Sequence, residues 1–252
     1  MTLKELDSLF TTVTSSFFFL SQLTNILCDE NWEPDYPWTW IDWTDVNSEF
    51  NTKEIVPDVI KKAPTDPVKV HYPQYPVDFG NTFHPIEFKR KPHRVKWRAE
   101  NESFYTLIVT GPDCPSQPQP SQREWQHWIV VNIPGNDWLK GETLTEYVGN
   151  SMLYRQGKHR IVYLVYKQPG NSSIKFDEER MLTISSCHPE RSKFKTKRFV
   201  RKYKLGDPIA GNFCWLLVGQ KTPYYIYDDE DDYCRKIVEN ITFDSLFTTK
   251  KK

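Results

Sequence analysis

Three polar residues lie beside strongly apolar runs, where a side chain able to bind or catalyse is unexpected. Asp113 follows one such run, His127 lies within a second, and His159 begins a third. A buried polar side chain costs free energy unless it is hydrogen-bonded, so such groups pair with one another or with a ligand. Each of these residues, taken alone, is more often a structural residue whose hydrogen bonds are made within the protein. Three of them on neighbouring strands indicate a pocket.

The chemistry best suited to this pocket is the binding of an anion. Each imidazole can donate a hydrogen bond, and a negative ligand favours its protonated form. The spacing of the three residues matches no metal-ligand signature, which makes a metal site a weak alternative. The run "GNSML" at 149–153 lacks the last glycine of a serine nucleophile elbow. The run "VGQKT" at 218–222 lacks the ending of a phosphate loop.

The elements expected to position these residues are short β-strands. Five runs are rich in β-branched and aromatic residues and are bounded by proline or glycine: 68–72, 93–97, 104–110, 126–133 and 159–168. The last three are nearly continuous in apolar content. We therefore expect them to be central strands that are covered on both faces.

Helical periodicity comes late in the chain. Residues 193–205 place Phe199, Val200 and Tyr203 on one face, and residues 231–241 show the same spacing. Strands followed by helices predict a mainly β fold with peripheral helices and a C-terminal helix.

The two ends of the sequence differ from its middle in residue composition and pattern. Residues 31–45 alternate tryptophan with acidic residues and proline, which suits neither a strand nor a helix. We therefore predict a poorly ordered extension at 1–50 and a domain at 51–247. Within the domain, 214–227 is unusually apolar for a connection and is interpreted as an insert.

Composition narrows the class of protein. The 252 residues hold 33 basic and 33 acidic side chains, so bulk charge favours no nucleic-acid partner. The five cysteines are scattered without a C-x-x-C pair, which favours reduced thiols in the cytoplasm over a disulfide framework or zinc site. The apolar N-terminal stretch fits neither a membrane span nor a secretory signal. We expect a cytoplasmic monomer without a cofactor, and secretion is the less favoured alternative.

Several motifs in order carry a resemblance to a known family: "YTLIVTGPDCPS", "REWQHWIVVNIPGND", "GKHRIVYLVYKQPG" and "RSKFKTKRFVRKYKLGDPIAGNF". Together they resemble the phosphatidylethanolamine-binding protein family, which includes Raf kinase inhibitor proteins and plant flowering regulators. The resemblance covers roughly residues 53–213. It implies a β-sandwich with a small anion pocket near one sheet edge and a C-terminal helix beside it. Members bind phospholipid head groups or small anions, several act on kinases or proteases, and established catalysis is not a family trait.

The resemblance also implies which residues form the pocket wall: Asp113, Pro115, Trp125, His127 and His159. Trp125 is then an apolar side of the pocket, and the two histidines face the phosphate. The Cys114–Pro115 and Arg123–Glu124 peptide bonds are expected to be cis.

The sequence departs from the family pattern around this pocket. Gly111 stands where the family has aspartate, and Ile161 and Val238 stand where phenols are usual. The loop 149–157 replaces the usual G-x-G-P-P run. We therefore expect a wider, more apolar recess that relies on the imidazoles, keeps affinity for a bare anion and loses discrimination for an ammonium-bearing head group.

Three functions follow in order of preference. The first is non-enzymatic binding of a small anion or a phosphatidylethanolamine-like head group, with regulation of a kinase, protease or other partner protein. The second is an interaction scaffold whose pocket has degraded, and the third is a hydrolase or metal site. The basic run 191–204 is interpreted as a solvated helix face, with peripheral contact to an acidic membrane as its alternative.

Overall fold

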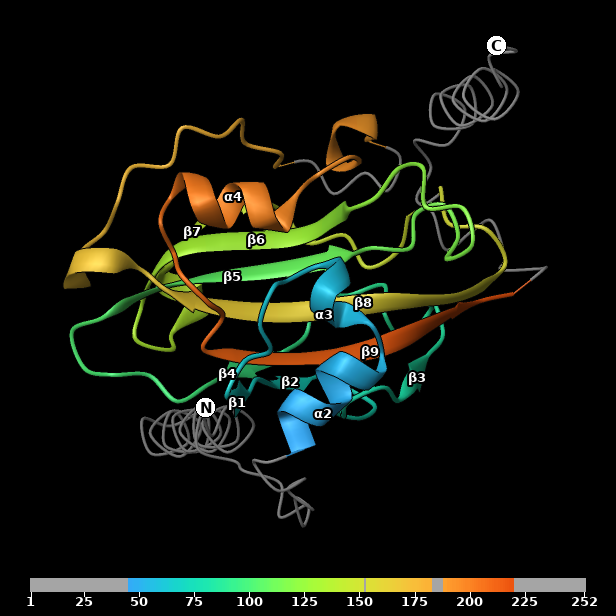
Figure 1. Ribbon diagram of the computed structural model, residues 1–252, viewed down its shortest axis with the longest axis horizontal. Coiled ribbons are helices and arrows are strands. Elements are labelled where there is room, and N and C mark those ends of the chain that lie inside the picture. Colours follow the sequence, from blue (N-terminus) through green and yellow to red (C-terminus); the bar gives the residue numbers. More distant parts are fainter. Residues whose placement is uncertain (1–44, 152, 183–187, 220–252) are drawn as a thin grey trace, which may run out of the picture. The chain divides into compact units, whose positions relative to one another are not determined.

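The computed structural model describes residues 45–151, 153–182 and 188–219 (Figure 1). The predicted C-terminal helix at 231–241, including Val238, lies outside this part of the chain, as do residues 1–44 of the predicted extension. The architecture below concerns the described residues alone.

Seven strands of the described residues form one open sheet, and two more form a small second sheet. The order in the large sheet is β1-β9-β8-β5-β6-β7, and β3 also pairs with β9. Neighbours among β5 to β9 are antiparallel, whereas β1 and β3 run parallel to β9. The large sheet comprises β1 (Asp66–Pro67), β3 (Thr82–Phe83), β5 (Phe104–Gly111), β6 (Trp125–Pro134), β7 (Glu142–Thr145), β8 (Gly157–Lys167) and β9 (Ala210–Val218). The small sheet comprises β2 (Lys69–His71) and β4 (Arg94–Lys96). All five predicted strands are confirmed.

Three α-helices are present among the described residues: α2 (Asp45–Thr52), α3 (Ile55–Asp58) and α4 (Thr196–Lys202). Three short 3-10 turns accompany them: η1 (Trp138–Lys140), η2 (Pro169–Asn171) and η3 (Pro189–Arg191). None of the described helices has the length and apolar character that crossing a bilayer requires.

Helix α4 confirms the predicted helix at 193–205 over a shorter range. Phe199 and Tyr203 are buried on its inner face, and Val200 is half-buried beside them. The buried Glu124 carboxylate accepts hydrogen bonds from the backbone N–H and the hydroxyl of Thr196 at the first turn. The helix therefore begins where a carboxylate supplies acceptors for otherwise unpaired donors.

The large sheet is covered on both faces, as the continuous apolar runs predicted. Along β5, Leu107 and Val109 belong to one buried cluster, whereas Ile108 between them belongs to another. Tyr163 and Val162 alternate in the same way along β8. The first cluster contains the buried apolar residues of the small sheet, and the second contains those of α2, α3 and α4. The fold is thus a mainly β sandwich with peripheral helices.

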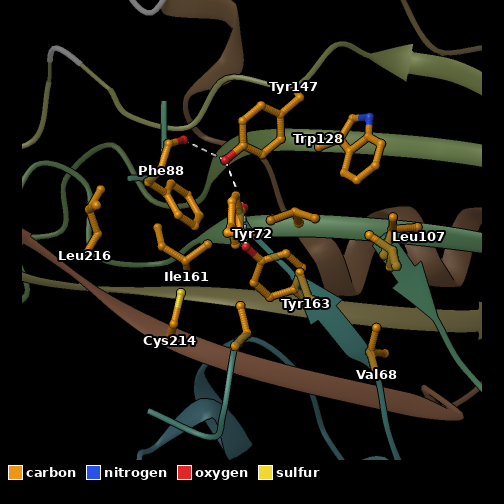
Figure 2. Packing of buried hydrophobic residues seen from close by; sticks show 14 of the residues in the cluster. Val68, Tyr72, Phe88, Leu107, Trp128, Tyr147, Ile161, Tyr163, Cys214 and Leu216 are labelled. Carbon is orange, nitrogen blue, oxygen red and sulfur yellow. Dashed lines mark hydrogen bonds between the residues drawn. The ribbon is translucent and has the colours of Figure 1, made fainter. Parts of the chain in front are cut away.

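Buried phenols meet inside the first cluster (Figure 2). The Tyr72 hydroxyl lies 2.9 Å from that of Tyr147 and 2.7 Å from that of Tyr163. Tyr147 also donates to the Phe88 carbonyl over 2.8 Å. Ile161, which stands where a phenol is usual, is fully buried in the same cluster. Its side chain therefore fills the core and does not widen a pocket.

Two predicted boundaries need correction. Residues 45–50 were assigned to the extension, but they lie in α2, where Val46 and Phe50 are buried. Phe50 packs edge-on against Phe213 with ring centroids 5.4 Å apart. Residues 214–218 were assigned to the insert, but they complete β9. An unbroken apolar run is the usual composition of a strand buried on both faces, which explains the second error. Residues 220–227 lie outside the described part.

Candidate functional site

The three polar residues that opened the sequence analysis lie on neighbouring strands. Asp113 follows β5, His127 lies in β6 and His159 in β8, and β5 pairs with both other strands. Both imidazoles contact one side chain, Tyr154. Its hydroxyl lies 2.7 Å from His127 Nε2, and its ring stacks on that of His159 with centroids 4.3 Å apart. The two imidazoles therefore meet at one side chain, and their contact with a ligand stays a prediction.

The space between the imidazoles is filled by Tyr154. A Cβ atom placed on Gly111 would lie only 1.9 Å from the Tyr154 hydroxyl and 2.9 Å from His127 Nε2. The Tyr154 hydroxyl therefore occupies the space in which a side chain at position 111 would lie. The expectation of a wider, more apolar recess is wrong, because a phenol from the atypical loop 149–157 has entered it.

His127 is held as a neutral ring. A carbonyl oxygen can only accept, so Nδ1 donates to Val148 over 2.7 Å, and Nε2 accepts from the Tyr154 hydroxyl. Burial lowers the pKa of His127 to about 3; the Val148 carbonyl opposes this shift, while the nearby Arg191 charge adds to it. At neutral pH the ring offers an anion neither a charge nor a free N–H.

His159 is also occupied by the protein itself. Its Nε2 lies 2.7 Å from the Arg155 carbonyl, and its Nδ1 lies 3.2 Å from the Asp113 carbonyl. Both ring nitrogens therefore lie against carbonyl oxygens of the chain, which can only accept a hydrogen bond. The ring is only 1% exposed. An anion reaching this imidazole must displace Tyr154 or a backbone contact.

The Asp113 carboxylate is paired with Arg160. The guanidinium Nη2 lies 2.6 Å from Oδ1 and Nε lies 3.0 Å from Oδ2, a two-point contact. Arg160 also reaches Asp58 over 2.9 Å, which ties β8 to α3. Burial alone would lower the pKa of Arg160, but the hydrogen bonds and charge of Asp113 outweigh it and raise that pKa. Asp113 is thus part of a buried ion-pair network.

Comparisons with known proteins identify the family of this chain. A profile described as phosphatidylethanolamine-binding protein matches residues 74–214. The Drosophila melanogaster protein named "Putative odorant-binding protein A5" is 37% identical over 161 residues, which cover 63% of this chain and 74% of that protein. This chain belongs to the phosphatidylethanolamine-binding protein family.

Solved structures of other proteins share the fold of this chain. A carboxypeptidase Y inhibitor, determined in complex with its cognate proteinase, superposes with a TM-score of 0.58 at 22% identity and covers 69% of this chain and 96% of its own. The phosphatidylethanolamine-binding protein of Plasmodium vivax gives a TM-score of 0.50 at 19% identity, covering 68% and 97%. At these identities the likeness concerns the fold alone.

The remaining predicted wall residues of this family member lie beside the filled recess. Pro115 is buried, and its carbonyl accepts from the backbone N–H of Arg155 over 2.8 Å, which holds the loop that carries Tyr154. Trp125 is fully buried, and its indole N–H has no hydrogen-bond partner among the described residues. Both peptide bonds expected to be cis are cis, and so is Val56–Pro57.

Two residues of the site were missed from the sequence, Tyr154 and Arg160. Arg160 directly follows His159 in the G-x-H-R motif, so the sequence could predict that it lies near the site. The sequence could not predict that its ion-pair partner is Asp113. Tyr154 left a weaker signal: a glycine at 111 and an atypical loop at 149–157 are two departures that compensate each other in space. Within the described residues, no group of three or more histidine, cysteine or acidic side chains is arranged to hold a metal ion.

Proposed function

We propose that this chain is a non-enzymatic binding protein that acts through contact with a partner protein, while Tyr154 keeps its family pocket closed. The observation that carries the proposal is the Tyr154 hydroxyl at 2.7 Å from His127 Nε2, in the room left by Gly111. Every ring nitrogen of the two imidazoles faces a protein atom, and the Asp113 carboxylate faces Arg160.

A protein partner is supported by the fold of a relative. The carboxypeptidase Y inhibitor was determined in complex with its cognate proteinase, so this fold engages a proteinase in that protein. Kinases and proteases are accordingly the partner classes that we propose to screen first. The interaction scaffold, our second choice on sequence alone, becomes the first.

Binding of a small anion or a phosphatidylethanolamine-like head group is the second candidate. It is favoured by the indole N–H of Trp125, a buried donor without a partner among the described residues, on the residue that pairs with Gly111 between β5 and β6. A buried unpaired donor is costly, so a ligand that supplies an acceptor gains free energy. The Drosophila relative is named for odorant binding, which also favours a small ligand. In this candidate Tyr154 must leave the recess first.

Calorimetric titration with phosphate and with phosphoethanolamine separates the two candidates. The native chain is expected to bind neither at millimolar concentration, whereas Tyr154→Ala is expected to bind phosphate because the recess opens beside His159. The double variant Tyr154→Ala/His159→Gln, matched except for the imidazole, is expected to lose that binding. Phosphate binding to the native chain as tight as to Tyr154→Ala overturns the closed pocket.

A cytoplasmic location remains part of the proposal. It is supported by Cys114 and Cys214, which are buried free thiols in the described residues. Burial raises the pKa of Cys114 to about 12, so this thiol is unreactive. Cell fractionation of the native protein tests the location, and recovery from the culture medium contradicts it.

A further inference from the structure

A second hollow, of about 450 Å³, lies beside α4. This α4 groove is lined by Val59, Ile60, Lys61, Tyr166, Lys197, Val200, Arg201, Lys204, Gly206, Asp207 and Pro208. Its floor is apolar, because Val59, Ile60, Tyr166 and Pro208 are buried. Its volume lies within the range of ligand sites, roughly 300–1,000 Å³.

The rim of the α4 groove is cationic. Four of its lining residues are basic, and the one carboxylate, Asp207, is paired with Lys62 over 3.4 Å. Lys61, Arg201 and Lys204 are exposed and have no ion-pair partner in the described part of the chain. The groove therefore combines an apolar floor with unneutralised positive charge.

Lys204 holds its place on the rim in an unusual backbone conformation. Its φ of 53° lies in the left-handed region, where glycine usually ends a helix. The N–H of Leu205 donates to the Val200 carbonyl over 3.0 Å and closes this last turn. A lysine here accepts backbone strain that a glycine would avoid. The side chain can thus be removed by a substitution that suits the backbone.

We propose that the α4 groove binds an acidic peptide segment of a partner protein, with an apolar side chain of that segment on the floor. Several negative charges are needed to neutralise this rim, so a ligand with one carboxylate would leave most of the cations unpaired. A flat anionic bilayer cannot reach a recessed floor, whereas a single peptide side chain can. The Arg201 guanidinium suits a two-point contact with a carboxylate.

This inference rests on the proposed protein-binding role and names the chemistry of the partner. Of the groove residues only Tyr166 belongs to β8 (Gly157–Lys167), near its end, whereas His159 lies near its start. The groove substitutions change no residue that contacts the two imidazoles, and peptide and phosphate binding are measured separately, so the two proposals fail separately.

Fluorescence anisotropy with a labelled peptide of sequence Glu-Asp-Glu-Phe-Glu-Asp-Glu tests the inference on the full chain. Lys61→Glu and Arg201→Glu are each expected to weaken binding about tenfold, because a like charge then faces the peptide. Lys204→Gly is expected to weaken binding about threefold while thermal stability stays equal or rises, because glycine suits the left-handed turn. The matched control Lys158→Glu, an exposed charge reversal at the other end of β8, should leave affinity unchanged.

Four results test the proposal against its alternatives. Equal weakening by Lys158→Glu would mean that bulk charge binds the peptide, which overturns the site. Equal binding of a Glu-Asp-Glu-Gly-Glu-Asp-Glu peptide removes the role of the apolar floor and overturns it too. The native chain could instead bind phosphatidylserine vesicles and not the peptide. If Arg201→Glu abolishes that vesicle binding, the surface is assigned to a membrane and the peptide proposal is overturned. Unchanged peptide binding by Tyr154→Ala supports the independence of the two hollows.

Discussion

The Tyr154 recess and the α4 groove both include residues of β8 and differ in whether a side chain of the protein fills them. At the start of β8, His159 and Arg160 are buried and paired with other parts of the chain. Towards its end, Tyr166 forms part of the floor of a groove whose cations are exposed. The predicted pocket residues thus lie where the space is taken, and the open space lies beside α4, where no pocket residue was predicted. Retained residue types alone do not establish a retained binding site.

The difference has a simple energetic cause. A buried polar group without a partner costs about 1–3 kcal/mol, which favours pairing within a closed recess. The indole N–H of Trp125 is an exception. Tyr154 supplies the partner of His127, and Asp113 supplies that of Arg160. On the α4 groove, water solvates the exposed cations, and no internal partner is required.

The largest contrast is expected between two aspartates. Asp113→Asn breaks a buried ion pair and should lower the free energy of unfolding by about 3 kcal/mol, because Arg160 is left under-neutralised. Asp207→Asn removes an exposed partner of Lys62 in the groove and should cost at most about 0.5 kcal/mol. Urea denaturation measures both. Similar costs at the two positions would remove the distinction between a closed and an open hollow.

The next contrast concerns pH. The pKa of His127 is about 3 in the folded chain, well below its ordinary 6.5. The unfolded ring takes up a proton below pH 6.5, whereas the folded ring does not. Stability is therefore complete above pH 6.5 and falls towards pH 3, by at most about 1.4 kcal/mol per pH unit. Urea unfolding between pH 4 and 7 measures this slope.

The matched variant for this slope is His127→Asn, which lacks the titrating ring. Burial also lowers the pKa of His93, but that residue contributes equally to both chains. The free energy of unfolding of the native chain should fall more steeply as the pH is lowered. The difference in slope corresponds to at most one proton taken up on unfolding. If the two slopes coincide, His127 is not held neutral by burial.

The smallest contrast concerns two buried tyrosines. Tyr154→Phe keeps the recess filled but leaves His127 Nε2 without its donor, so stability should fall by about 1–2 kcal/mol. Tyr166 lines the groove, and its hydroxyl has no hydrogen bond within the described residues. Tyr166→Phe should therefore lower the free energy of unfolding by about 0.5 kcal/mol or less. Thermal denaturation compares them, and a larger loss at Tyr166 contradicts the assignment of the hydroxyl of Tyr154 to His127.

Apolar runs and local motifs predicted the strands because both signals are short in range. The five predicted strands and helix α4 rest on periodicity within one segment. The boundaries at 50 and 214 failed because the same patterns describe a docked helix and a buried strand as well as an extension and an insert. Only packing, such as Phe50 against Phe213, distinguishes these cases.

The sequence by itself therefore determined the family, the mainly β sandwich and the meeting of His127 with His159. Tertiary structure alone decided that the recess between them is filled. Free space depends on the volumes of side chains from distant segments, here the missing side chain of Gly111 and the added ring of Tyr154. The α4 groove was hidden for the same reason, since its floor and rim come from positions as far apart as Val59 and Pro208.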